Sequence, residues 1–298
     1  MALSETTVPG LSFSRSLVNR QVPLPRMSFS PPVSLNSLRH SSCVSVIKRS
    51  PKRLKYSAPR FTKGGELLYV KIELLEGEAW KLEPVVELLK NGAVGVIPTD
   101  TVYAIVCDLK SHSAIERLRR IKDIDTSKPL SILCRSLKDI DTYTMGFPCG
   151  NTEGQINIFR AVKHCLPGPY TFILPASKEL PKQCMKYGAA PKSRKSVGVR
   201  MPDDPICQSI LRQLDAPLIS TSVKWPTQDA WMIDPVIIAD TYAPEGLDFV
   251  VDGGIRIADP STVVDMTGSS PTIIRQGKGP KQDWMAVKDE VDSTSITD

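Results

Sequence analysis

The 298-residue sequence contains no run of about 18 consecutive apolar residues, so we expect no transmembrane helix and no membrane partner. Its seven cysteines are odd in number and scattered, and none forms a C-x-x-C pair, which argues against a disulfide framework or a zinc site. Of the three histidines, His40 lies in the basic N-terminal segment, and His112 and His164 have no nearby cysteine or histidine at metal-ligand spacing. We therefore expect no protein-held metal.

Several catalytic motifs are also missing. The sequence has no G-x-x-x-x-G-K-[ST], no G-x-G-x-x-G after a strand, no G-x-S-x-G and no H-E-x-x-H. The sites that these motifs build are thereby excluded. A nucleotide, if one binds, must be held in some other way.

Acidic residues are nearly absent from the first 65 residues. This segment holds eleven of the 38 Lys and Arg residues and a single acid, Glu5, so it carries +10 while the remaining 233 residues carry −4. It is rich in Ser, Arg and Pro and lacks a secretory apolar core, which is typical of an organellar transit peptide. We predict a leader over residues 1–60 that targets the chloroplast, with the mitochondrion as the alternative. A disordered basic tail that binds RNA or membrane is the other interpretation.

Strand and helix patterns alternate from residue 64 to residue 284, which predicts one mixed α/β domain followed by a disordered tail over residues 285–298. Irregular spacing indicates that some strand pairs are antiparallel. Strands are predicted at residues 67–72, 93–97, 130–133, 170–174, 197–201, 217–220, 249–251, 262–264 and 272–274. Helices are predicted at residues 80–89, 156–164, 205–214 and 236–239, and another is predicted to begin at the cap Ser113.

Residues 93–103 are the most informative stretch. The apolar run Ala93–Ile97 fits a strand buried on both faces, and Pro98 ends it. Thr99, Asp100 and Thr101 follow at once, at the sheet edge where open α/β proteins bind ligands. A turn whose Thr and Asp side chains cap the next element is the alternative interpretation.

Hydroxyl side chains recur beside the ends of other predicted strands. They include Thr171, Ser220, Thr221, Ser222, Ser261 and Thr262, and the cations Lys122, Arg200, Lys224 and Arg275 lie near several of them. Hydroxyls, backbone amides and cations that converge at a sheet edge suit an anionic ligand. Each hydroxyl alone is equally consistent with a local turn bond, so the joint pattern carries the inference.

The segment Pro98-Thr99-Asp100-Thr101-Val102-Tyr103 resembles the P-T-[DE]-T-[VY]-Y/F-G-L opening of the YrdC-like family. The similarity continues in order across residues 66–284, through residues 122–133, 166–172, 197–200, 220–222, 261–265 and 275–277. It implies a YrdC/RibB-like fold, a twisted open mixed α/β sheet with flanking helices and a concave basic face. The best-known members are threonylcarbamoyl-AMP synthases, which join threonine, bicarbonate and ATP into the intermediate used for tRNA modification.

The resemblance also implies roles for individual residues. Thr99 and Thr101 would face the threonine end of the cleft. ATP would be bound by Lys122, Thr171, Arg200, Ser220, Ser222 and Arg275. A carbamate formed on the threonine nitrogen would attack the α-phosphate and expel pyrophosphate, with Mg²⁺ expected on the triphosphate.

The sequence departs from the synthase pattern at two positions. The expected K-x-R reads Lys122-Asp123-Ile124, and the expected S-x-N reads Ser222-Val223-Lys224. The pattern is closer to the YciO-type branch, whose members are thought not to substitute for the synthases. Because an Arg–phosphate contact stabilises a phosphoryl-transfer transition state, its loss at position 124 predicts weak or specialised activity. We expect Lys122 and Lys224 to be the catalytic cations, with Lys224 partly restoring the charge.

A second class of function is non-catalytic binding of double-stranded or structured RNA, such as tRNA or rRNA. Such binding needs a positive face of suitable curvature, and residues 178–195 supply six cations for it. A solvated loop is the alternative interpretation of that segment.

Overall fold

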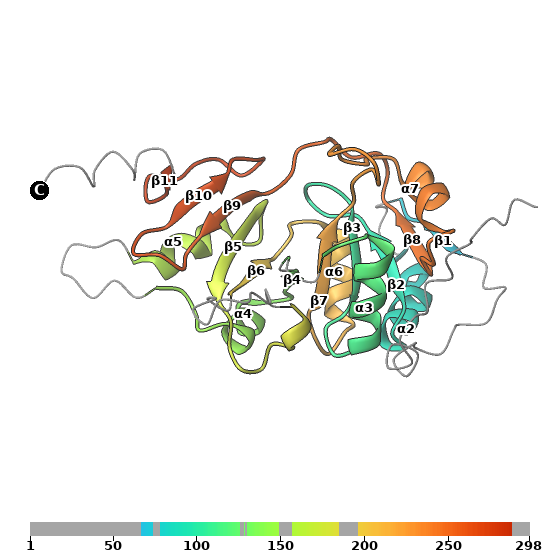
Figure 1. Cartoon of the computed structure of the whole chain (residues 1–298), viewed down its shortest axis with the longest axis horizontal. Coiled ribbons are helices and arrows are strands. Elements are labelled where there is room, and N and C mark those ends of the chain that lie inside the picture. The colour runs from blue at the N-terminus through green and yellow to red at the C-terminus, as the bar shows by residue number, and fades with distance from the viewer. Residues whose placement is uncertain are drawn as a thin grey trace, which may run out of the picture. The chain divides into compact units, whose positions relative to one another are not determined.

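The computed structural model describes residues 67–73, 78–125, 128, 130–148, 157–184 and 196–287. These residues form one open, eleven-stranded mixed sheet with helices packed against it (Figure 1). The predicted leader and residues 288–298 of the predicted tail lie outside the described residues. No helix of the described part is long and apolar enough to cross a membrane.

The sheet runs in the order β1-β8-β2-β3-β7-β4-β6-β5-β9-β10-β11. Five of the ten neighbouring pairs are parallel and five are antiparallel. The strands are β1 (Leu68–Lys71), β2 (Val94–Ile97), β3 (Ala104–Asp108), β4 (Ser131–Leu133), β5 (Tyr170–Pro175), β6 (Ser196–Arg200), β7 (Leu218–Ser222), β8 (Phe249–Asp252), β9 (Thr262–Asp265), β10 (Thr272–Arg275) and β11 (Ala286–Val287).

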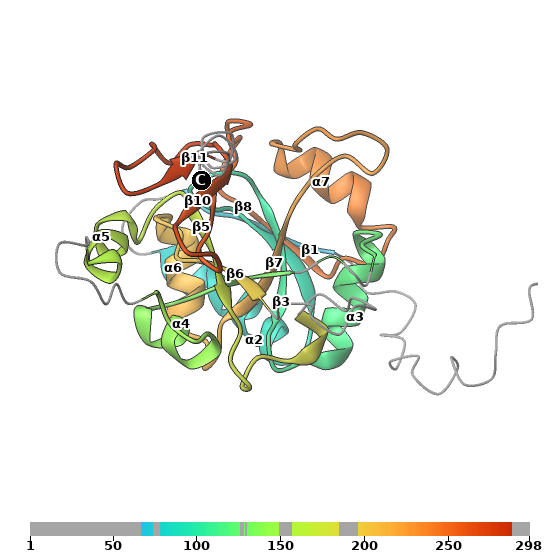
Figure 2. The same cartoon turned by 60° about the vertical axis from the view of Figure 1, so that its left-hand side comes forward.

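The described helices are short, from three to ten residues. They are η1 (Glu78–Leu82), α2 (Glu83–Lys90), α3 (His112–Ile121), α4 (Leu137–Tyr143), α5 (Ile158–Cys165), η2 (Lys182–Cys184), α6 (Pro205–Arg212) and α7 (Pro235–Tyr242). Figure 2 shows that α2 and α6 lie together, well apart from α7.

Every strand and helix predicted from the sequence is present to within a few residues, but the prediction missed β3, α4, η2 and β11. The predicted cap Ser113 is wrong. Ser111 has the extended backbone that a cap needs, and its hydroxyl accepts a hydrogen bond from the Ala114 amide at 3.4 Å. The two residues of β11 lie inside the segment predicted to be a tail, and they pair with β10.

Successive residues of the central strands face opposite sides of the sheet, which gives two hydrophobic cores. In β3, Ile105 and Cys107 belong to one core, whereas Ala104 and Val106 belong to the other. The first core contains side chains of α3, α4, α5 and α7, and the second contains side chains of α2 and α6. The sheet is therefore covered by different helices on its two faces.

One part of the second face carries small and polar residues instead of core residues. Ser220 of β7, Ser131 of β4, Gly198 of β6 and Ile173 of β5 are paired in one row across the four strands. Directly paired residues share a face, and all four line an open cleft. A Cβ at Gly198 would lie 2.6 Å from the Ser131 hydroxyl, so a side chain there would crowd the cleft floor.

The contact between β2 and β8 gives a test of the packing. Gly95 pairs with Phe249, and a Cβ at Gly95 would lie 2.3 Å from ring carbons of Phe249. We expect Gly95→Ala to lower the free energy of unfolding by about 1–3 kcal/mol, because the ring must leave its place. Urea denaturation measures this change.

The matched control is Gly268→Ala, since the nearest atom to an added Cβ there is 3.8 Å away. It should change the free energy of unfolding by less than about 0.5 kcal/mol. Equal stability of the two variants would contradict the packing described for Gly95.

Candidate functional site

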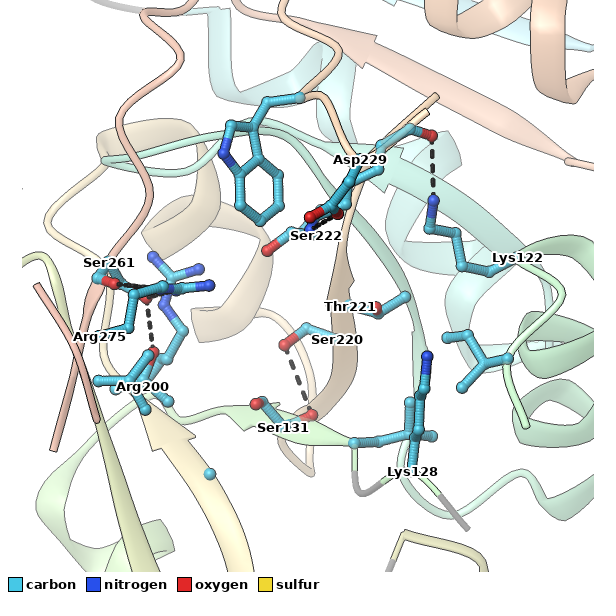
Figure 3. A pocket seen from close by; sticks show the side chains of 18 of the residues that line it. Lys122, Lys128, Ser131, Arg200, Ser220, Thr221, Ser222, Asp229, Ser261 and Arg275 are labelled. Atoms are coloured by element: carbon cyan, nitrogen blue, oxygen red, sulfur yellow. Dashed lines mark hydrogen bonds and ion pairs between the residues drawn. The ribbon is translucent and has the colours of Figure 1, made fainter. Parts of the chain in front are cut away.

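The cleft on the open part of the sheet has a volume of about 600 Å³. Figure 3 shows Arg200, Arg275 and Ser261 on one side, Lys122 and Lys128 on the other, and Ser131 and Ser220 between them. Its lining contains five cations, Lys122, Lys128, Arg200, Lys224 and Arg275, against two carboxylates, Asp123 and Asp229. The cleft therefore carries a net positive charge.

Arg200 is the most buried cation of the cleft, with 5 % of its surface exposed. It ends β6, and its Nη2 donates to Asp100 Oδ1 and to Thr101 Oγ1, both at 2.9 Å. Burial lowers the pKa of Arg200, and Asp100 opposes that shift. Among the described residues, its Nε has no hydrogen-bond partner. A buried donor without a protein partner can be satisfied by a water molecule or by another oxygen.

Lys122 lies at the opposite side, directly after α3. Its Nζ donates to the Lys224 carbonyl at 3.0 Å and to the Tyr242 hydroxyl at 2.9 Å. Burial, together with repulsion from Lys224, lowers the pKa of Lys122 to about 8. Asp123 follows in the left-handed backbone region, at φ 52°, and this bend ends the helix so that Lys122, Asp123 and Ile124 all line the cleft.

Lys224 follows β7 and shares an aromatic neighbour with Arg275. The Lys224 ammonium lies 4.2 Å from the centre of the Trp231 ring and pairs with Asp229, while the Arg275 guanidinium lies 5.7 Å from the same ring. Cation–π attraction of this kind holds a long side chain in place without neutralising it. The Lys224 charge is thus shared with Asp229, whereas Arg275 has no carboxylate partner among the described residues.

Arg275 is fixed by the start of β9. Its Nη2 donates to the Ser261 carbonyl at 2.9 Å, and the Ser261 hydroxyl shares a 2.7 Å hydrogen bond with Thr171. A Cβ at Gly277 would lie 2.1 Å from the Pro260 carbonyl oxygen, so only glycine permits this close approach. Burial and the nearby Arg200 both lower the pKa of Arg275.

Seven of the nine site residues predicted from the sequence line this one cleft. They are Lys122, Thr171, Arg200, Ser220, Ser222, Lys224 and Arg275. Residues from segments that lie far apart in the sequence therefore line one cleft, as expected. Their predicted roles in binding and catalysis stay predictions.

Thr99 and Thr101 are not among the residues that line this cleft, and the prediction that they face its threonine end stays a prediction. Both are buried, with 0 % and 4 % of their surface exposed. The Thr99 hydroxyl donates to the Val102 carbonyl at 2.7 Å, and Thr101 accepts from Arg200. Their hydroxyls close the β2–β3 turn and position the arginine, as the turn interpretation of this segment allowed.

The sequence prediction missed Ser131, Ser196, Gly198, Trp225 and Asp229 in the lining. In Ser196–Arg200, small or polar residues alternate with valines, which is the period-2 signal of a strand with one face outside the core. The pair Trp225 and Trp231 in seven residues was a second available signal.

Two further predictions concern the basic segment at residues 178–195 and the ligands for a metal ion. Of the six cations predicted in residues 178–195, Lys178 and Lys182 are described and do not line the cleft, and the others lie outside the described residues. The described residues contain no group of three or more His, Cys, Asp or Glu side chains that could hold a metal ion.

The arrangement suits an elongated polyanion. Arg200 and Arg275 stand on one side of a floor of hydroxyls, and Lys122 and Lys128 stand on the other, so negative oxygens can be paired along its length. Hydroxyls supply further donors without adding charge. Apolar contact comes from residues such as Ile124, Ile173 and Trp225.

Comparison with known proteins agrees with this geometry. Residues 87–277 match the Sua5/YciO/YrdC domain model, which is described as telomere recombination. The chain is 34% identical over 194 residues to the uncharacterized protein YciO of Escherichia coli, which covers 65% of this chain and 87% of YciO. The crystal structure of E. coli YciO superimposes with a TM-score of 0.63 at 30% identity, over 74% of this chain and 99% of that chain.

Enzymes of the family are related more distantly. Human threonylcarbamoyl-AMP synthase is 30% identical over 195 residues, which is 62% of this chain and 63% of the human protein. The fold of Pyrococcus abyssi Sua5, crystallised with L-threonine, matches with a TM-score of 0.60 at 23% identity, over 71% of this chain and 57% of that chain. From the domain match and the similarity to YciO, we conclude that the chain belongs to the Sua5/YciO/YrdC domain family.

Proposed function

We propose that the cleft binds a nucleoside triphosphate together with threonine, and that the protein is a threonylcarbamoyl-AMP synthase-like enzyme of weak or specialised activity. The observation that carries the proposal is the buried Arg200 guanidinium, whose Nε has no partner among the described residues while its Nη2 is held by Asp100 and Thr101. Because Asp100 and Thr101 fix this guanidinium in the lining of the cleft, its charge can stabilise an anion there with little reorganisation.

The charge of the cleft supports a triphosphate as the anion. Arg200 lowers the pKa of Arg275, and Lys224 lowers the pKa of Lys122, so like charges lie close together at two places in the cleft. Like charges held together are costly until an anion separates them. A polyphosphate chain reaching from one pair to the other relieves both repulsions.

The proposed chemistry asks the protein for positioning and charge stabilisation. Threonine and bicarbonate condense to a carbamate, whose oxygen attacks the α-phosphorus of ATP and displaces pyrophosphate. Arg275 and Lys224 would stabilise the charge that grows on the phosphate oxygens, while Ser131 and Ser220 orient the chain of phosphates. Magnesium would arrive on the triphosphate and supply a further positive charge.

Positions 124 and 224 explain why we propose weak activity. Ile124 packs against the first core and also lines the cleft, where the synthase pattern has a guanidinium. Lys224 lies across from it, with its carbonyl 3.0 Å from the Lys122 ammonium. The Lys224 ammonium, which follows β7 and lines the same cavity, would partly replace the cation missing at position 124.

The reaction gives the first test. The full-length protein should release pyrophosphate from ATP only when threonine and bicarbonate are both present. Arg275→Met should slow this release by about a hundredfold, because it removes a proposed phosphate contact and leaves no buried cavity. An enzyme-coupled pyrophosphate assay measures the rate.

Arg212→Met, which removes an exposed cation at the end of α6, is the matched control and should leave the rate unchanged. Salt-sensitive binding of double-stranded or structured RNA with no pyrophosphate release would overturn the enzyme proposal and favour the RNA-binding alternative.

The charge replacement at position 224 gives a second test. Lys224→Ala should weaken ATP binding about tenfold, measured by calorimetry, since a charged hydrogen-bond donor is lost. Ile124→Arg combined with Lys224→Asn restores the synthase pattern and should raise the rate of pyrophosphate release above wild type. Unchanged ATP affinity in Lys224→Ala would contradict the replacement. The exposed Lys90→Ala is the control.

The pKa of Lys122 gives a pH dependence. Because this pKa is lowered to about 8, Lys122 is charged below pH 8 and loses its proton as the pH rises through that value. Affinity for inorganic tripolyphosphate should therefore fall about tenfold between about pH 7.5 and about pH 9.5. Lys122→Arg keeps its charge over this range and should remove the dependence; the same slope in this variant would show that another group titrates.

A further inference from the structure

The segment after β7 folds back on itself at the mouth of the cleft. The Val223 amide is bonded to the Tyr103 carbonyl at 2.9 Å, and Lys224 forms an antiparallel bridge with Trp231. The Trp225 amide donates to the Ala230 carbonyl at 2.9 Å. These bonds close a loop of residues 226–229, and all four residues of the loop line the cleft. Trp225 therefore stands on a backbone anchored to the sheet.

The two indoles of this loop have different surroundings. The Trp231 ring already has the Lys224 ammonium at 4.2 Å and the Arg275 guanidinium at 5.7 Å. Trp225 also lines the cleft, and 37 % of its surface is exposed. Within the described part of the chain, no ring stacks on Trp225 and no cation lies over it. One large aromatic face is thus left open in a polar cleft.

An exposed indole beside a phosphate site is a stacking surface for a planar ring. Stacking on a nucleobase buries apolar area that the free protein leaves in water, and it does not depend on hydrogen-bonding pattern. The hydroxyls of the floor can pair with phosphates but offer no flat surface to a base. A guanidinium can stack on a base, but Arg200 is held by Asp100 and Arg275 by the Ser261 carbonyl. The base of a bound nucleotide therefore has one suitable partner at this rim.

We propose that Trp225 is the base-stacking residue of the cleft and that it makes the site selective for nucleoside triphosphates over simple polyphosphates. This inference rests on the proposed triphosphate site. Trp231 acts as a positioning residue that holds Lys224 and Arg275 toward the phosphates. Trp225 therefore recognises the base, and Trp231 contributes to phosphate binding through these two cations.

The test compares ATP with inorganic tripolyphosphate, which has the charge but no base. Calorimetry on the full-length protein should show that ATP binds about tenfold more tightly than tripolyphosphate. Trp225→Ala should remove this difference by weakening ATP alone, and Trp225→Phe should retain most of it. Trp80→Ala removes another exposed indole, on η1, and should alter neither affinity.

Each other outcome has a definite meaning. Unchanged ATP affinity in Trp225→Ala overturns the stacking role. An equal loss of ATP and tripolyphosphate affinity overturns it as well, because it shows that Trp225 supports the loop and not the base. If tripolyphosphate and ATP both fail to bind the wild-type protein, the triphosphate site itself is refuted and the stacking inference falls with it.

Discussion

The buried ion pair between Arg200 and Asp100 is the constraint on which the cleft depends. Both side chains are about 5 % exposed. Removing water from two such charges costs free energy, and their attraction offsets this cost only if the geometry of the pair is good and its other polar atoms are hydrogen-bonded. The pair is held from three directions: Asp100 accepts from the Asp203 amide, its carbonyl accepts from Lys278, and Thr101 bonds to Arg200. It thereby joins the β2–β3 turn to the end of β6 and to the loop after β10.

The other cations of the cleft are held by weaker means. Lys122 and Arg275 are bonded to neutral backbone carbonyls, and Lys224 is paired with an exposed carboxylate and an indole. Surface pairs of the last kind contribute little to stability and exchange readily for a stronger partner. The cleft thus combines one cation held by a buried carboxylate with others held by neutral groups or by an exposed carboxylate.

Much of this arrangement could be predicted from the sequence, and the failures have physical causes. The strand at Val94–Ile97 was recognisable because Pro98 ends an apolar run, whereas Ala104–Asp108 was missed because a short strand buried on both faces has no alternation. Helix α4 was missed because Lys138, Asp139 and Asp141 obscure its apolar positions.

Side-chain direction was the harder part to predict. The position of Thr99 and Thr101 at a strand end follows from the sequence, but whether a hydroxyl turns to the cleft or to the backbone is decided by the turn itself. Ser111 and Ser113 are equally good caps by composition, and only the backbone angles separate them. Trp225 and Trp231 are alike as residues and differ only in what surrounds them.

The row of Ser220, Ser131 and Gly198 has a consequence for how this domain can change over time. A larger apolar residue at Ser220 or Ser131 would fill part of the hollow and add buried surface, so it would remove a hydroxyl donor while favouring the folded state. Gly198 differs, because a Cβ there would lie 2.6 Å from the Ser131 hydroxyl and 3.1 Å from Thr171 Cγ2, so a side chain would force its neighbours to move. The two serines are therefore kept small at the expense of buried area, whereas the glycine is required by the strands around it.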